Sequence, residues 1–110
     1  MDFQKIFDRA LEVREKYYQL EEKKLGKPWT RAQVAQGFVG DVGDLMKLLM
    51  AKDGLREIRG VDNIDERLAH ELADCLWCIL VLSKEYGVNL EKVFLENMQA
   101  LEERISQESI

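Results

Sequence analysis

Apolar residues recur in four stretches of the chain with the spacing of one face of an α-helix. The first stretch runs from residue 2 to about residue 25, and charged residues fill the positions between its apolar ones. Leu25-Gly26-Lys27-Pro28 ends it, because glycine suits the left-handed cap of a helix and proline cannot continue one. The apolar row of this first helix consists of Phe3, Ile6, Ala10, Val13, Tyr17 and Leu20.

The second stretch runs from residue 30 to about residue 51, and the third from residue 63 to residue 86. Thr30 and Gln33 fit a capping box, in which each side chain accepts a hydrogen bond from the backbone amide of the other residue. Asn63 or Asp62 caps the third helix, and Gly87 supplies its left-handed stop. The core-facing rows are Val34, Phe38, Leu45 and Leu49 on the second helix, and Ile64, Leu68, Leu72, Cys75, Ile79, Leu82 and Tyr86 on the third.

A fourth helix follows an Asn89 cap and runs from residue 90 to about residue 106. Four helices with short links predict an all-α four-helix bundle, in a single domain over residues 1–110. Two of these helices carry apolar residues beyond their core-facing rows, so they must be buried on two sides. In a chain this short we expect the second side to contact another subunit, in a dimer or a dimer of dimers. The additional residues are Met46 and Met50 on the second helix, and Leu76, Trp77, Leu80 and Val81 on the third.

Two pairs of acidic residues lie within the core-facing rows: Asp41 with Asp44, and Glu71 with Asp74. Residues three apart on a helix are separated by about 300° of turn, so both side chains of a pair leave the same face. Carboxylates directed into a bundle interior are costly unless something compensates them. Four that converge would repel one another, and a hard divalent cation such as Mg²⁺ is the natural counter-charge. One such pair is commonly a solvated surface feature, but two pairs on neighbouring helices predict a metal site.

The segments around the two pairs resemble the MazG-type, all-α nucleoside triphosphate pyrophosphohydrolases. These segments read Phe38-Val39-Gly40-Asp41-Val42-Gly43-Asp44-Leu45 and Glu71-Leu72-Ala73-Asp74-Cys75-Leu76-Trp77. The first resembles the G-E-V-G-E-L motif of the small branch that is similar to deoxycytidine-triphosphate pyrophosphatases. Asp41 and Asp44 stand where that family has Glu, and the likeness spans residues 29–104.

This resemblance implies Mg²⁺-dependent hydrolysis of a nucleoside triphosphate to a monophosphate and pyrophosphate, as nucleotide-pool housecleaning. It assigns metal binding and catalysis to the four acidic residues of the two pairs. Substrate contacts would come from the aromatic residues Trp29 and Trp77 and from Asn97 and Arg104, which match the fourth-helix pattern of the family. Ala100 replaces a lysine of that pattern, so one candidate phosphate contact is missing.

A second interpretation is a catalytically inactive helical dimerisation or regulatory module with the same fold. Replacing Glu by Asp withdraws a carboxylate by about 1.5 Å, one carbon–carbon step, and Mg²⁺ demands near-ideal geometry. Ala100 favours the same interpretation. Against it, all four positions remain acidic. For Trp29 alone, a packing role is the commoner explanation, and stacking on a nucleobase is the alternative.

Three glycines, Gly37, Gly40 and Gly43, lie three apart beside the first acidic pair. Each costs about 1 kcal/mol relative to alanine in a helix interior. Their spacing predicts a smooth surface that either another helix backbone or a ligand approaches closely.

Charge and composition narrow the range of partners. The net charge of −5 leaves no basic excess to neutralise phosphates, which argues against binding of nucleic acid. No apolar run approaches the length of a membrane span, and the N-terminal residues lack the apolar core of a signal peptide, so we expect a cytoplasmic protein.

Cys75 and Cys78 form a C-x-x-C within a helical pattern, and we expect Cys75 to be a packed thiol.

Overall fold

The computed structural model describes residues 2–108, and this range contains four α-helices and no strand. The helices are α1 (Phe3–Leu25), α2 (Arg31–Lys52), α3 (Ile64–Glu85) and α4 (Leu90–Glu108). The prediction of an all-α fold built from four helices is therefore confirmed. The helix boundaries agree with the expected ones to within two residues, which is the usual uncertainty of helix ends.

Side-chain caps fix where the helices begin. Thr30 and Gln33 form the predicted capping box at the start of α2, with hydrogen bonds of 2.8 and 3.2 Å. Asn63 accepts a hydrogen bond from the backbone amide of Glu66 and so caps α3. At the C-terminal ends, Gly26 (φ 80°) follows α1 and Gly87 (φ 68°) follows α3, and both adopt the left-handed conformation that favours glycine.

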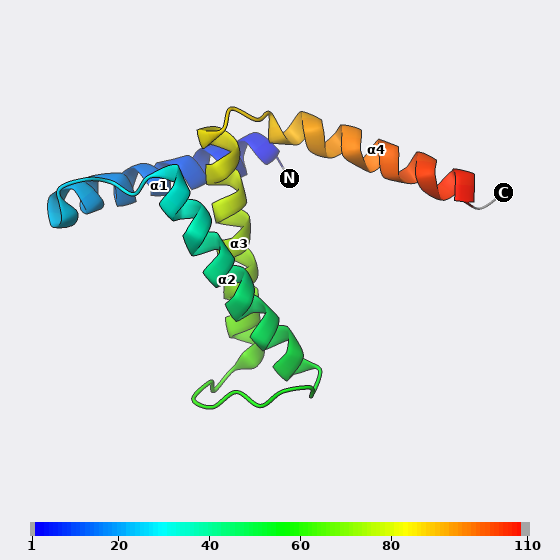
Figure 1. The fold of residues 1–110 in the computed structure, drawn as a ribbon, viewed down its shortest axis with the longest axis horizontal. Coiled ribbons are helices and arrows are strands. Elements are labelled where there is room, and N and C mark those ends of the chain that lie inside the picture. Colours follow the sequence, from blue (N-terminus) through cyan, green and yellow to red (C-terminus); the bar gives the residue numbers. More distant parts are fainter. Residues whose placement is uncertain (1, 109–110) are drawn as a thin grey trace.

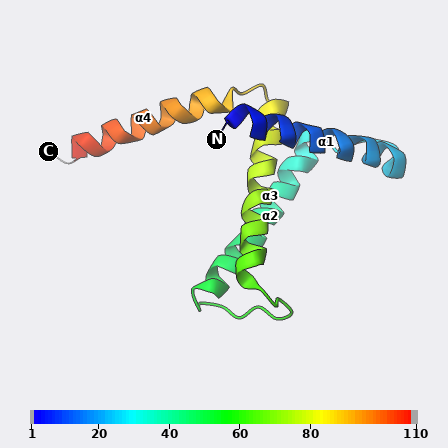
Figure 2. The same ribbon diagram turned by 180° about the vertical axis from the view of Figure 1, so that it is seen from behind.

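The helices pack as a hairpin with one helix laid across it. The helices α2 and α3 run antiparallel, and α1 crosses them near the end where α2 begins and α3 ends (Figures 1 and 2). The helix α4 continues away from this assembly, and none of its residues is buried. The molecule is consequently elongated, with principal dimensions of 59 × 39 × 26 Å.

The core lies where α1, α2 and α3 meet. Val81 is 0% exposed and Leu80 is 2% exposed, which makes α3 the most buried helix. Leu76 of the additional row is 47% exposed. The expectation that Trp77 and Val81 face another subunit is wrong, because α1 covers that side of α3. The indole Nε1 of Trp77 donates a hydrogen bond to the carbonyl oxygen of Ala10 at 3.1 Å across this contact. The buried apolar residues are Ala10, Val34, Leu48, Cys75, Cys78, Leu80 and Val81.

Part of the expected core-facing row of α3 lies on the surface instead. Leu72, Ile79 and Tyr86 are 52%, 39% and 53% exposed. The helix α3 contacts α2 through a face centred on Glu71, Cys75 and Cys78. The row of Leu72, Ile79 and Tyr86 points away from α1, and α2 therefore covers only the edge of this row.

Within residues 2–108, no helix combines the length and apolar character needed to cross a bilayer.

Candidate functional site

The two acidic pairs lie on the helices of the hairpin. Asp41 and Asp44 extend from α2, and Glu71 and Asp74 extend from α3. Their surroundings differ: Glu71 is buried at 8% exposure, Asp41 and Asp74 are half-buried, and Asp44 is exposed. The four carboxylates therefore range from a buried one, that of Glu71, to an exposed one, that of Asp44.

Glu71 is the electrostatic centre of this group. Burial raises the pKa of its carboxyl above the ordinary value, and the negative charges of Asp41, Asp74 and Asp44 raise it further, in that order. Arg67 opposes the shift by lowering this pKa. The Oε2 atom of Glu71 is buried without a hydrogen-bond partner. A buried, unpartnered carboxylate oxygen among three other carboxylates leaves negative charge that Arg67 offsets only in part.

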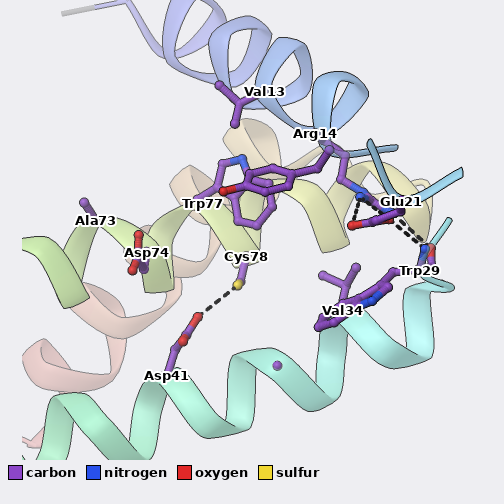
Figure 3. Close-up of a pocket in the computed structure, with 12 residues that line it drawn as sticks. Val13, Arg14, Glu21, Trp29, Val34, Asp41, Ala73, Asp74, Trp77 and Cys78 are labelled. Carbon is purple, nitrogen blue, oxygen red and sulfur yellow. Dashed lines mark hydrogen bonds and ion pairs between the residues drawn. The ribbon is translucent and has the colours of Figure 1, made fainter. Parts of the chain in front are cut away.

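A thiol links Asp41 to α3. Cys78 Sγ donates a hydrogen bond to Asp41 Oδ2 at 3.5 Å (Figure 3). Burial, this hydrogen bond and the charge of Asp41 raise the pKa of Cys78 to about 12. Burial and the nearby carboxylates also raise the pKa of Cys75. Both cysteines are buried free thiols, so they stay protonated at neutral pH and unreactive, as expected for packed residues.

As the side chains are oriented, the part of the chain from residue 2 to residue 108 contains no group of three His, Cys, Asp or Glu residues arranged to hold a metal ion. Asp74 Oδ2 instead lies 3.3 Å from His70 Nε2, one turn earlier on α3. Asp74 is half-exposed in this pair, so side-chain rotation can turn its carboxylate toward Glu71.

A cavity of about 600 Å³ opens beside the acidic residues, between α1, α2 and α3 (Figure 3). Asp41 and Asp74 form part of its wall, and three aromatic residues, Tyr17, Trp29 and Trp77, form another part. The rings of Tyr17 and Trp77 are in contact, with centroids 5.9 Å apart. Most of the lining is apolar in character, and the carboxylates of Asp41 and Asp74 enter it from one side. This combination suits a small ligand that has both a planar apolar part and a charged part.

The structure brings together only some of the predicted substrate residues. Trp29 and Trp77 both line the cavity, although Trp77 also serves as a packing residue through its bond to α1. Asn97 and Arg104 lie exposed on α4, which leads away from the cavity. One chain therefore does not place these two residues beside the acidic cluster.

The glycine row of α2 has one close neighbour. A Cβ atom at Gly37 would lie 3.4 Å from Cζ3 of Trp29, so the indole packs against the helix backbone at this point. A Cβ at Gly40 or Gly43 would meet nothing within 4 Å. Close approach by another helix of the same chain is therefore wrong for these two positions, and approach by a ligand or another subunit stays a prediction.

Two residues of the cavity wall, Arg14 and Glu21, were not identified from the sequence. They form an ion pair at 3.1 Å with side chains that are only 9% and 14% exposed. The sequence contains a signal for Arg14, which lies four residues after Ala10 and three before Tyr17, within the apolar row of α1. A charged residue at such a position needs a buried partner.

A family model, the MazG nucleotide pyrophosphohydrolase domain, matches residues 39–107, which is more than half of the chain. The matched range contains both acidic pairs and most of α2, together with α3 and nearly all of α4. It does not include α1 or Trp29. No curated protein and no solved structure is significantly similar to the chain.

Proposed function

The chain belongs to the MazG nucleotide pyrophosphohydrolase family, and from this premise we propose that it is an Mg²⁺-dependent nucleoside triphosphate pyrophosphohydrolase. The proposed reaction converts a ribo- or deoxyribonucleoside triphosphate to its monophosphate and pyrophosphate, as part of nucleotide-pool housecleaning. The observation that carries the proposal is the buried carboxylate of Glu71, with its unpartnered Oε2, among three further carboxylates beside a cavity of ligand size.

The residues present fit a hard divalent cation. Such ions prefer carboxylate oxygens as ligands. The cluster supplies the carboxylates of Asp41, Asp44, Glu71 and Asp74, and softer ligands such as thiols do not outnumber them. The unpartnered Oε2 of Glu71 is an acceptor that no donor among residues 2–108 satisfies, which leaves this oxygen free to bind an ion. When bound, Mg²⁺ would neutralise the phosphate oxygens and the charge that develops on them during the reaction.

The chain's own residues would divide the remaining tasks. Carboxylates of the cluster would hold the metal, and one that does not hold it would accept a proton from the attacking water. The water oxygen forms a bond to the α-phosphorus, the bond from that phosphorus to the bridging oxygen breaks, and pyrophosphate leaves. The aromatic walls of the cavity, including Trp29 and Trp77, would bind the base and exclude water around it.

A panel of ribo- and deoxyribonucleoside triphosphates tests the reaction directly. We expect pyrophosphate release in Mg²⁺ from at least one nucleotide, none after chelation, and a loss of about a hundredfold or more in Glu71→Gln. Glu102→Gln removes an exposed carboxylate from α4 and is the matched control, which should leave turnover unchanged. Absence of release from every nucleotide, in protein shown to be folded, would refute the enzymatic proposal.

The alternative is an inactive interaction module with the same fold. Two observations favour it: the shortened carboxylates at Asp41 and Asp44, and the absence from residues 2–108 of three metal-binding side chains already arranged around one point. The double change Asp41→Glu plus Asp44→Glu separates the two proposals. In a site adapted to short carboxylates it lowers turnover, and in a decayed site it raises turnover from near zero.

We further propose that the protein acts as a homo-oligomer, a dimer or a dimer of dimers, located in the cytoplasm. The support for association is the number of large apolar side chains that remain exposed on α2, α3 and α4. A second subunit could also bring Asn97 and Arg104 to a cavity that they do not reach within one chain.

A further inference from the structure

A buried ion pair connects two turns of α1 to the segment that precedes α2. Arg14 Nη1 lies 3.1 Å from Glu21 Oε1 and 3.2 Å from Oε2. The other terminal nitrogen of Arg14, Nη2, donates to the carbonyl oxygen of Trp29 at 3.0 Å. Glu21 Oε1 accepts a hydrogen bond from the backbone amide of Trp29 at 2.7 Å. One ion pair therefore binds both backbone polar groups of this tryptophan.

The side chain of Trp29 is held at the cavity by the same contacts. Its indole packs against the backbone of Gly37 and is 43% exposed. Figure 3 shows it beside Val34, below the Arg14–Glu21 pair. An aromatic ring that rests on a helix backbone and still exposes much of its surface to a cavity is suited to stack on a planar ligand.

Stability alone is a weak reason for burying this pair. The desolvation of two charges offsets most of their attraction, and apolar residues of similar size often serve equally well. Arg14 Nε is also buried without a hydrogen-bond partner, which adds to the cost. What the pair supplies, and apolar residues cannot, is a directed hydrogen bond to each backbone group of Trp29. The geometry therefore favours a positioning role.

We propose that Arg14 and Glu21 are positioning residues that fix Trp29 as a stacking wall for the base of the nucleotide. The inference rests on the proposed function for the identity of the ligand. It gives neither residue a part in the chemistry, so it concerns affinity for the nucleotide and not turnover. All three residues precede residue 39, where the family match begins.

The position of Trp29 can be measured without substrate. The full chain labelled with 5-fluorotryptophan contains two fluorinated residues, Trp29 and Trp77, whose ¹⁹F resonances are assigned with Trp29→Phe and Trp77→Phe. Arg14→Met plus Glu21→Leu should shift the Trp29 resonance toward that of the free amino acid and leave Trp77 in place. The matched control is the exposed pair Arg9–Glu12 on the same helix, at 3.0 Å, changed in the same way. An unmoved Trp29 resonance in the folded double variant overturns the inference.

Affinity is tested by titrating the labelled proteins with dCMP, dTMP, dAMP and dGMP. We expect the double variant to bind about tenfold more weakly, since base stacking on one aromatic ring accounts for a difference of that order. In turnover, KM should rise by a similar factor while kcat stays within about twofold. Glu21→Gln keeps an oxygen that accepts a hydrogen bond from the Trp29 amide, so it should lose less affinity for the nucleotide than Glu21→Ala. If the double variant does not fold, the comparison of these two single variants tests the inference in its place.

The outcomes separate this inference from the proposed function. If no monophosphate perturbs Trp29 in the wild type, or if the variants bind as tightly as the wild type, the stacking role is wrong whatever the enzyme does. If nucleotides bind at Trp29 but no triphosphate is hydrolysed in Mg²⁺, the proposed function fails and the role of Trp29 stands.

Discussion

Glu71 combines burial with three neighbouring negative charges, and both raise its pKa. In the metal-free protein, its carboxyl therefore keeps a proton at pH values where the unfolded chain has already released it. Above the ordinary range of a glutamate, the folded state binds more protons than the unfolded state, so the free energy of unfolding falls as pH rises toward the raised pKa. The cluster thus destabilises the metal-free fold at neutral pH.

Glu71→Gln removes this charge at every pH. We expect the variant to have a higher Tm than the wild type at pH 7 in a chelator, and the difference to disappear near pH 4, about where free glutamate titrates. Mg²⁺ should raise the Tm of the wild type and have little effect on the variant. Thermal unfolding followed by circular dichroism measures both effects. A variant that is less stable than the wild type at pH 7 without metal would contradict this account of the cluster.

Cys78 orients a carboxylate of the cluster through its 3.5 Å bond to Asp41. Because burial and this contact raise the pKa of Cys78 to about 12, the thiol remains a donor at neutral pH. We expect Cys78→Ala to weaken Mg²⁺ binding by about tenfold, as loss of such outer contacts commonly does, and Cys78→Ser to retain most of the affinity. Calorimetric titration with MgCl₂ measures this. Cys75→Ala, which also truncates a buried thiol of α3, is the control; equal losses in both alanine variants would exclude an orienting role.

At the scale of single residues, the sequence indicated candidate site residues but not the contacts that hold them. The acidic pairs and Trp29 were recognisable because their residue types and spacing are local features. The partners of Trp29 were not, since Arg14 and Glu21 are seven residues apart on α1 and meet it only through the chain reversal after Gly26. Side-chain contacts that depend on a reversal of the chain leave little trace in periodicity.

The helices themselves were predictable for a physical reason. Their starts are set by side chains that bond to nearby amides, as at Thr30 and Asn63, and their ends by glycines that adopt a left-handed conformation. Which side of α3 is buried was not predictable in the same way. That choice depends on where α1 crosses the hairpin, and the contact between Trp77 and Ala10 joins residues that are 67 apart in the sequence.

The covered side of α3 gives a prediction at the level of this element. Val81 is fully buried between the helices, so Val81→Ala should lower the free energy of unfolding by about 2 kcal/mol, from lost burial and the cavity that remains. Val88→Ala makes the same chemical change in the link between α3 and α4, at a residue that is 44% exposed and lies outside the helices, and it should cost less than about 1 kcal/mol. Urea unfolding of both variants measures the difference. Equal effects would mean that α1 does not cover α3.

The whole molecule exposes an apolar face that its own chain does not cover. We call it the hairpin face: residues of α2 and α3 that recur at helical spacing and are 39–71% exposed. On each helix, the row of exposed apolar residues lies roughly 100° around the helix axis from the residues that contact the other helix, and the turn has the same sense on both helices. Because the two helices are antiparallel, both rows lie on the same side of the hairpin. Trp77 and α1 lie on the opposite side. The hairpin face consists of Val39, Val42, Met46, Leu49, Leu72, Leu76 and Ile79.

The helix α4 also exposes large apolar side chains. Phe94 and Leu95 are 56% and 62% exposed, and no residue of this helix is buried. Isolated helices of this length are marginal in water, so an amphipathic helix that buries none of its residues gains from a partner that covers its apolar side chains. An exposed two-helix face and an exposed amphipathic helix in one short chain favour association between copies over a stable monomer.

We therefore expect sedimentation at low micromolar concentration to give at least twice the monomer mass of 12.8 kDa. Leu76→Glu on the hairpin face and Phe94→Glu on α4 should each dissociate the oligomer, because a charge buried in an apolar contact is costly. Val81→Glu is not a suitable probe, since it disrupts the core of one chain. Gln99→Glu adds the same charge at an exposed polar residue of α4 and should leave the mass unchanged. A well-folded wild-type monomer would refute the expectation, and its α4 would then have to be ordered by contacts within one chain.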